Sequence, residues 1–549
     1  MRKLVVVLAA ATVLGAVAWV NRMEVMMRVP GIIGRITQPV GENVPVVWRP
    51  GPAAAPSGPR PPNIVVIVAD DLGYNDLTFG GGGVANGAVP TPNIDGIARA
   101  GVEYTRGYAG NATCAPSRAA IMTGRYPTRF GFEFTPAPKQ FMRLIAWMRR
   151  NERMPPVYHA DRERDVPALA QEGVPPSEIT IAELLRGAGY RTLGLGKWHL
   201  GESPQFRPLA QGFDEYLGFG SGAALFMPQD DPSVVNSKQE FDPIDKFLWA
   251  NLVYGVTKDG GPRFAPKGHL TDYLSGEAAA AIGANKNRPF FLYLAYNAPH
   301  TPLQALRSDY EALPQIENHT LRTYAAMIRG LDRGVGVVLD ALRANSLEEN
   351  TLVIFTSDNG GAEYIGLPDI NKPYRGWKMT FFEGGIRTPF FAKWPARLPA
   401  GERFHTPVAH VDIFATAAGA AGAPLPSDRV IDGVDIVKLA RGEAQGRPHG
   451  AIFWRSGQYR TILADDWKLQ VSERPKKTWL FDLAADPTEQ RNLAETRPDK
   501  LAELAAILAE HEKQMVLPLW PSLIDGPIAV DHTLKQPIAE GDEYVYWAN

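Results

Sequence analysis

Residues 63–71 read Asn-Ile-Val-Val-Ile-Val-Ala-Asp-Asp, a run of mostly β-branched residues that ends in two adjacent carboxylates. A continuous apolar run of this length is typical of a strand that is buried on both faces of a parallel sheet. Removing two like charges from water is costly, so Asp70 and Asp71 need a compensating charge. A bound hard metal ion would supply it; a helix cap with one exposed acid is the alternative.

Further strand and helix patterns follow this run in alternation. Strands are expected at 192–195, 290–295 and 352–356, and helices at 91–100, 180–188 and 324–344. The alternation predicts an α/β fold, in which helices sandwich a large, mainly parallel sheet. Sites in such sheets form beyond the carboxyl ends of the strands, where the polar clusters of this sequence lie.

The composition changes near residue 440. Short strand patterns follow at 452–454, 459–463, 467–471 and 479–481, and a helical pattern at 497–514. They predict a smaller C-terminal antiparallel α+β subdomain with a tail over 441–549, after a main domain over 63–440 that holds the polar clusters. Residues 23–62, proline-rich from 49 onward, are predicted to be a linker.

Length and composition exclude several classes of protein. A chain of 549 residues can bury a large core, and its formal net charge of -2 gives no sign of a nucleic-acid partner. Cys114 is the only cysteine, which excludes a disulfide framework.

The N-terminus has the composition of an export segment. Arg2 and Lys3 precede the uncharged run Leu4–Val20. This run is long for a signal-peptide core and at the short limit for a membrane span, so residues 1–22 are either a cleaved signal or a retained anchor. Both predict an exported, periplasmic or otherwise extracytoplasmic protein, and the anchor adds membrane association.

Cys114 lies in the stretch Cys114-Ala-Pro-Ser-Arg118, which continues to Thr123-Gly124. Ser117 can cap a helix start and Arg118 brings a permanent positive charge, and a helix start that carries an arginine is suited to holding an anion. From these residues alone, a reactive thiol and an inert buried cysteine are both possible.

The stretch resembles the first signature of the sulfatases, Cys-x-Pro-Ser-Arg followed by Thr-Gly, and departs from it only at Met122, where leucine is usual. The later motifs keep the family's order, so the resemblance covers roughly residues 60 to 500. It implies an alkaline-phosphatase-like fold and hydrolysis of sulfate monoesters, as in arylsulfatases. It also implies that a maturation enzyme converts Cys114 to formylglycine, whose hydrate is the nucleophile.

Three more segments resemble family motifs: Gly196-Lys197-Trp198-His199, Pro299-His300-Thr301-Pro302 and the region of Lys378. Taken alone, the lysines would be solvated and the histidines packed or in turns. The resemblance implies that Lys197, His199, His300 and Lys378 join Cys114 and Arg118 as catalytic residues. His410 also falls in a recurring family segment, without an assigned role.

The segment Ser357-Asp358-Asn359-Gly360 follows the strand expected at 352–356 and completes a set of oxygen donors. Three carboxylates and one amide favour calcium or magnesium over zinc, and a simple turn is the alternative. The resemblance implies one calcium ion, bound by Asp70, Asp71, Asp358, Asn359 and an oxygen of the modified residue 114.

The reaction that the resemblance implies begins when a hydroxyl of the hydrated aldehyde attacks sulfur, with Asp358 as a candidate for taking its proton. His300 or Lys378 assists the leaving oxygen, and His199 deprotonates the second hydroxyl to release sulfate. Two other functions stay open: a phosphate or phosphonate ester hydrolase on the same fold, and an inactive, membrane-anchored binding protein.

Segments 136–178 and 222–262 match no motif and are expected to build the mouth of the site. They contain the basic amphipathic stretch 141–150 and apolar residues at 223–227 and 247–253. This predicts a small sulfate ester with an apolar, aryl or steroid-like leaving group. The alternative is that these residues only pack against the body or the membrane.

Overall fold

The computed structural model describes residues 22–55, 57–444 and 446–549. The apolar run Leu4–Val20, predicted to be a signal or an anchor, lies outside these residues. Within the described ranges, no helix is both long enough and apolar enough to cross a bilayer.

A ten-stranded mixed sheet forms the centre of the molecule, in the order β14-β2-β13-β12-β1-β10-β5-β6-β8-β9. The five strands from β12 to β6 are parallel, and β13 and β8 pair antiparallel with the two sides of this block. The predicted α/β class and its mainly parallel sheet are therefore confirmed. The strands are β1 (Asn63–Ala69), β2 (Val102–Tyr104), β5 (Arg191–Lys197), β6 (Glu215–Phe219), β8 (Val256–Lys258), β9 (Arg263–Phe264), β10 (Phe290–Ala295), β12 (Thr351–Ser357), β13 (Phe390–Lys393) and β14 (Glu402–Phe404).

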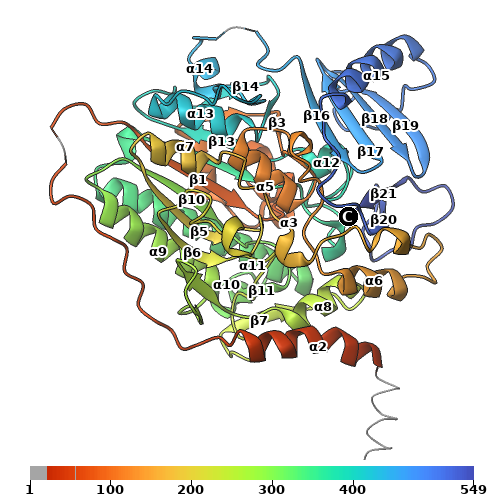
Figure 1. Cartoon of the computed structure of the whole chain (residues 1–549), viewed down its shortest axis with the longest axis horizontal. Helices are drawn as coiled ribbons and strands as arrows, with labels where there is room; N and C mark the ends of the chain where they lie inside the picture. Colours follow the sequence, from red (N-terminus) through yellow and green to blue (C-terminus); the bar gives the residue numbers. More distant parts are fainter. Residues whose placement is uncertain (1–21, 56, 445) are drawn as a thin grey trace, which may run out of the picture.

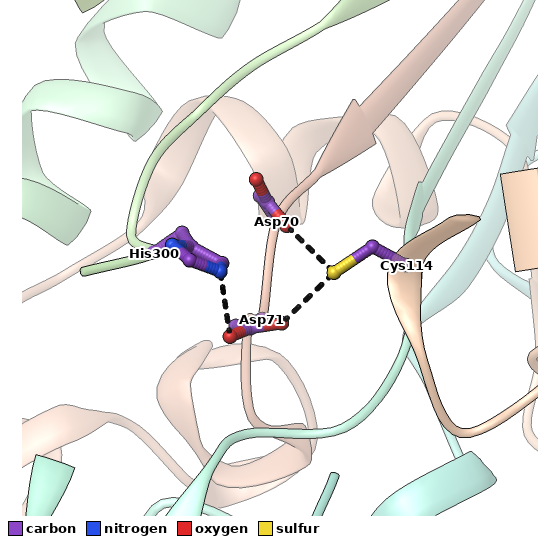
Figure 2. A group of neighbouring side chains, drawn as sticks. All are labelled: Asp70, Asp71, Cys114 and His300. Atoms are coloured by element: carbon purple, nitrogen blue, oxygen red, sulfur yellow. Dashed lines mark hydrogen bonds and ion pairs between the residues drawn. The ribbon is translucent and has the colours of Figure 1, made fainter. Parts of the chain in front are cut away.

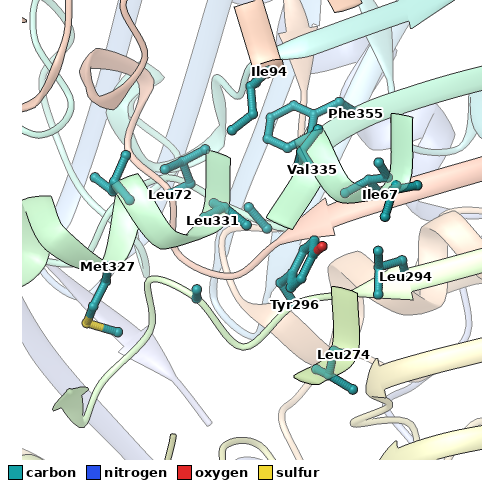
Figure 3. Packing of buried hydrophobic residues seen from close by; sticks show 14 of the residues in the cluster. Ile67, Leu72, Ile94, Leu274, Leu294, Tyr296, Met327, Leu331, Val335 and Phe355 are labelled. Atoms are coloured by element: carbon teal, nitrogen blue, oxygen red, sulfur yellow. The ribbon is translucent and has the colours of Figure 1, made fainter. Parts of the chain in front are cut away.

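Helices cover both faces of the sheet, which explains why β1 is apolar at every position. Val65 and Ile67 belong to one buried cluster, part of which is drawn in Figure 3, and Ile64 and Val66 belong to another. The first cluster includes residues of α4 (Pro92–Arg99), α9 (Leu270–Asn285) and α11 (His319–Ala344), and the second includes residues of α5 (Cys114–Thr123), α7 (Ile181–Gly187) and α13 (Asp412–Ala421).

The C-terminal region forms a separate antiparallel sheet in the order β16-β17-β18-β19, at the right of Figure 1 with α15 (Pro498–Glu512). Its strands are β16 (Ala451–Ser456), β17 (Tyr459–Ala464), β18 (Trp467–Glu473) and β19 (Lys476–Asp482), so all four short strands occur where they were predicted. The last strands, β20 (Ile524–Ala529) and β21 (Tyr544–Ala548), form a third sheet with β4 (Val157–Tyr158), a pairing that the sequence did not indicate. The domain boundaries at residues 62 and 440 stay predictions.

The remaining elements connect and border these layers. Helix α2 begins the described chain and lies along α8 at the lower edge of Figure 1. The other elements are α2 (Arg22–Thr37), α3 (Val84–Gly87), α6 (Lys139–Met148), α8 (Pro243–Asn251), α10 (Arg307–Glu311), α12 (Glu383–Ile386), α14 (Ile436–Ala440), β3 (Gly107–Tyr108), β7 (Val234–Ser237), β11 (Leu303–Leu306) and β15 (Val408–Ala409).

Candidate active site

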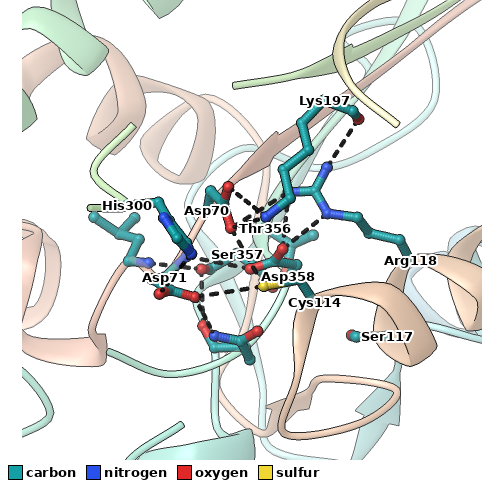
Figure 4. A network of polar contacts seen from close by, with 12 residues as sticks. Asp70, Asp71, Cys114, Ser117, Arg118, Lys197, His300, Thr356, Ser357 and Asp358 are labelled. Carbon is teal, nitrogen blue, oxygen red and sulfur yellow. Dashed lines mark hydrogen bonds and ion pairs between the residues drawn. The ribbon is translucent and has the colours of Figure 1, made fainter. Parts of the chain in front are cut away.

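Four parallel strands end side by side, and each brings polar side chains to one buried cluster (Figure 4). Because parallel strands share the edge at which they end, residues far apart in the sequence meet there. Asp70 and Asp71 follow β1, Lys197 ends β5, His300 lies in the loop after β10, and Asp358 and Asn359 follow β12.

Gly196 permits the close approach of β5 to β10 just before Lys197. Its φ is +97°, and a Cβ atom there would lie 1.8 Å from the carbonyl oxygen of Ala295. Any other residue would push the strand, and with it Lys197, out of the cluster.

Cys114 is the first residue of α5 and is buried, and Figure 2 shows its sulfur pointing at the two carboxylates after β1. Its Sγ lies 3.6 Å from Asp70 Oδ1, 3.8 Å from Asp71 Oδ1 and 3.1 Å from Lys378 Nζ. The one cysteine of the chain is thus held between two acids and a cation at the amino end of a helix.

Three cations neutralise the three carboxylates of the cluster, and all six side chains are buried. Lys197 Nζ lies 2.8 Å from Asp70 Oδ2, Lys378 Nζ lies 2.8 Å from Asp71 Oδ1, and Arg118 Nη2 lies 2.8 Å from Asp358 Oδ2. The formal charges therefore cancel. Adding a divalent cation would give the cluster a net charge of about +2, which suits an anionic group.

The donor atoms of the cluster fit a hard cation. Asp70, Asp71, Cys114 and His300 each offer a ligand atom, and these atoms all lie within 4.8 Å of one another. Asn359 donates from Nδ2 to Asp71 Oδ1 at 2.7 Å, whereas its buried Oδ1 has no hydrogen-bond partner among the described residues. An amide oxygen that lacks a hydrogen-bond partner, beside two carboxylates, fits calcium or magnesium. His300 also belongs to this group of ligand atoms, whereas the prediction included only oxygen donors.

Both histidines of the cluster are buried, and they differ in the hydrogen-bond partners of their ring nitrogens. His300 Nδ1 lies 2.5 Å from the carbonyl oxygen of Thr301, which can only accept, so Nδ1 carries the hydrogen. His300 Nε2 faces Asp71 Oδ2 at 3.6 Å. Burial and the nearby Lys197 lower the pKa of His199 well below its usual value, and within the described part of the chain His199 Nδ1 has no hydrogen-bond partner. His199 is therefore neutral near pH 7 and able to accept a proton.

Two residues after strand ends adopt backbone conformations that are rare outside glycine. Asp71 has φ of +60° and His199 has φ of +62°. Left-handed backbone at non-glycine residues costs free energy and gathers at functional sites. In this cluster it turns the chain so that the side chains of Asp71 and His199 remain at the strand ends.

Sequence reasoning missed one residue that supports the site, Tyr364, and named another, His410, without a role. The Tyr364 hydroxyl donates to Asp71 Oδ2 at 2.8 Å and lies 3.1 Å from Lys378 Nζ. His410 lies 3.0 Å from the hydroxyls of Ser117 and Thr356, so it ties α5 to β12 behind the cluster. Tyr364 is on a 3-10 turn, where no periodic signal identifies it.

A pocket of about 160 Å³ is lined in part by Glu363, the residue before Tyr364 in the sequence. Both segments predicted to form the mouth contribute to its walls, together with the C-terminal tail. Glu363 is buried, and burial raises its pKa to about 7. Its Oε2 finds no hydrogen-bond partner in the ranges that the structure describes. The lining consists of Arg149, Glu152, Arg153, Met154, Phe241, Pro243, Glu363, Pro527, Ala529, Leu534, Gln536, Pro537 and Ile538.

The apolar stretch 223–227, by contrast, is buried in the body. Phe226 is fully buried and stacks on His269 with ring centroids 5.2 Å apart. On α6 and α8, Phe141 and Phe247 pack against each other at 4.5 Å. Much of the apolar character that suggested a mouth therefore serves internal packing.

Comparison with known proteins gives consistent matches. Residues 62–423 match the family model described as Sulfatase, and residues 375–516 match the model of the N-sulphoglucosamine sulphohydrolase C-terminal region. The chain is 33% identical to N-acetylgalactosamine-6-sulfatase of Mus musculus, over 84% of this chain and 88% of that protein. It is also 33% identical to steryl-sulfatase of Mus musculus, over 75% of this chain and 70% of that protein. The crystal structure of Ps i-CgsB in complex with k-i-k-neocarrahexaose aligns with a TM-score of 0.69 at 33% identity, covering 84% of this chain and 95% of that one.

Proposed function

The chain belongs to the sulfatase family of hydrolases, which act on sulfate esters, and from this premise we propose that a formylglycine made from Cys114 is its nucleophile and that a calcium ion completes the site. One observation carries the proposal: Cys114 Sγ stands within 3.8 Å of both Asp70 and Asp71, at the start of α5. Cys114 has no second cysteine with which to form a disulfide. An oxygen on the same carbon would face the carboxylates of a cation site.

The calcium ion would be held by Asp70, Asp71, Asp358 and Asn359. The negative charges of the three carboxylates are balanced by Lys197, Lys378 and Arg118. When present, the ion and the hydrated aldehyde supply Lewis-acid stabilisation of sulfate oxygens and a hydroxyl nucleophile. These groups account for binding and for the attack on sulfur.

Proton transfer falls to side chains at the edge of the cluster. His300 has Nδ1 committed to the Thr301 carbonyl, so Nε2 is the atom that would first take up a proton and then pass it to the leaving oxygen. Burial lowers the pKa of His300, and Asp71 at 3.6 Å from Nε2 favours the protonated form that this step needs. Lys378, whose pKa Asp71 raises against the effect of burial, stays charged and stabilises negative charge beside residue 114. His199 is neutral and receives the proton that must be removed when sulfate is released.

The alcohol side of the substrate is proposed to lie in the pocket beside Glu363. Its walls include Met154, Phe241, Leu534 and Ile538, which favour an apolar aryl or steroid-like body. The partnerless carboxylate of Glu363 favours a leaving group that also carries a hydroxyl or amine donor. The names of the relatives include a sugar sulfatase and a steryl-sulfatase, so both substrate classes belong in the assay.

The test uses full-length protein made together with a formylglycine-generating enzyme. Peptide mass spectrometry should show an aldehyde at residue 114, and turnover should be greater with sulfate esters than with matched phosphate and phosphonate esters. Full activity with an intact thiol, or in Cys114→Ala, would contradict the nucleophile. A preference for phosphate or phosphonate esters would favour the second hydrolase function, and an aldehyde-bearing protein without turnover of any ester would favour a binding role.

A further inference from the structure

Helix α2 has two different faces. On one face Met27 and Gly31 are buried against α8: the Met27 carbonyl accepts a hydrogen bond from Asn251 Nδ2 at 2.7 Å, and a Cβ atom at Gly31 would lie 2.7 Å from the Ala250 carbonyl oxygen. Positions 27 and 31 are four apart and therefore lie on one side of a helix. This side attaches α2 to the body.

The other face of α2 is apolar and exposed. Val29, Ile32, Ile33 and Ile36 have exposed fractions of 41%, 46%, 54% and 75%. At about 100° per residue these four side chains fall within an arc of roughly 100°, and the arc is centred opposite Met27 and Gly31. Single exposed apolar residues are ordinary, but four on one helical stripe indicate a surface with a partner.

Two further features indicate which partner covers this stripe. The α2 sequence holds three arginines and one glutamate, a net charge of +2, and the exposed Arg28 and Arg35 border the apolar stripe. The uncharged run Leu4–Val20 ends two residues before α2 begins. An apolar stripe with a basic border, directly after a bilayer-compatible run, has the composition of a helix that lies in a membrane interface.

We propose that α2 lies flat on a phospholipid bilayer that contains anionic lipids, with Val29, Ile32, Ile33 and Ile36 in the headgroup and acyl boundary. The body is then held on the opposite side of α2 through α8. The pocket has a fixed relation to this surface, because Pro243 at the start of α8 lines the pocket whereas Asn251 at its end holds α2. The eight residue steps from Pro243 to Asn251 place the two about 12 Å apart along the helix.

The test measures lipid contact at single positions in the full-length chain. Bimane is attached to Ile33→Cys and, separately, to Ile36→Cys, and the protein is reconstituted into vesicles of phosphatidylcholine and phosphatidylglycerol with brominated acyl chains. Cys114 is buried, so we expect the dye to react with it much more slowly than with an exposed cysteine. The matched control is Leu425→Cys, which is 43% exposed and follows α13, at the opposite edge of Figure 1 from α2.

Brominated lipid should quench bimane at positions 33 and 36 at least threefold more than at position 425. Replacing Val29, Ile32 and Ile36 with serine in the Ile33→Cys protein should remove this difference, while turnover of a soluble sulfate ester is retained as proof of folding. Equal quenching at 33 and 425 would overturn the proposal. The proposal would also be overturned if, without lipid, position 33 became shielded as the protein concentration was raised. A second copy of the chain would then cover the stripe.

Discussion

Replacing Lys378 with methionine tests the charge balance of the site, because Asp71 and Cys114 share this cation. Asp71 is 4% exposed and would keep the hydrogen bonds from Tyr364 at 2.8 Å and Asn359 at 2.7 Å, with longer contacts to Cys114 Sγ at 3.8 Å and His300 Nε2 at 3.6 Å. Breaking a buried ion pair costs about 3–5 kcal/mol, and the two remaining donors place the expected loss of folding free energy near the lower end. Losing a positive charge beside residue 114 should also lower kcat/KM by roughly 10²- to 10³-fold.

The loss of stability should depend on pH with a definite sign. Burial acts to raise the pKa of Asp71, but Lys378 and His300 outweigh it, so the pKa lies below its usual value and the ionised pair stabilises the fold at neutral pH. Without Lys378 the pKa of Asp71 rises, and the buried charge then destabilises the fold above that pKa. The gap between wild type and variant should be widest near pH 8 and shrink toward pH 5, as calorimetric Tm values would measure.

Lys468→Met is the matched control, since Lys468 is also a fully buried lysine that lies 2.9 Å from the buried carboxylates of Glu383 and Glu489. It should destabilise the fold by a similar amount while the folded fraction keeps its kcat/KM for an aryl sulfate. Conversion of residue 114, followed by mass spectrometry in both variants, separates a catalytic loss from failed maturation. The reasoning is refuted if Lys378→Met keeps activity within threefold of wild type, or if Lys468→Met loses as much activity in the folded state.

Three further outcomes are expected. Chelation with EDTA should lower both Tm and kcat, and calcium should restore both better than zinc; an unchanged Tm and kcat would count against the cation site. Glu363→Leu should raise KM at least fivefold for aryl sulfates that carry a hydroxyl or amine and leave KM for unsubstituted aryl sulfates unchanged. An equal effect on both substrates would mean that Glu363 does not recognise the substrate. Because the pKa of His199 lies well below its usual value, kcat should stay level down to pH 6 and fall only in more acidic buffer, whereas a midpoint at or above pH 6.5 would exclude His199 as the neutral base.

The sheet was predictable because its central strands are apolar on both faces. The patterns at 192–195, 290–295 and 352–356 lie inside β5, β10 and β12, and tertiary packing had no reason to override them. The pairing of β4 with β20 was not predictable. Strand β4 has only two residues, and Pro527 within β20 argues against a strand when the sequence is read alone.

The cluster was predictable to the extent that it sits at strand ends. Asp71, Lys197 and Asp358 follow or finish strands with clear patterns, so topology alone brings them together. Tyr364 reaches Asp71 from a three-residue 3-10 turn, and only the folded loop reveals that contact. The resemblance to the family identified His300 and Lys378, whose loops carry no periodic signal.

The composition of an apolar stretch does not reveal whether its side chains contact protein, substrate or lipid. Two stretches of this chain illustrate different outcomes. Residues 223–227 are apolar on every side and are buried, with Phe226 stacked on His269, so they offer little surface to a ligand. Helix α2 instead has an exposed apolar stripe on one side, and its opposite side packs against α8. A helix that packs one side against the protein and exposes an apolar second side leaves that second side for another phase. If that phase is lipid, an apolar sulfate ester that partitions into the bilayer would reach the pocket from the membrane side, and vesicles that contain such an ester should be better substrates than the same ester in detergent micelles.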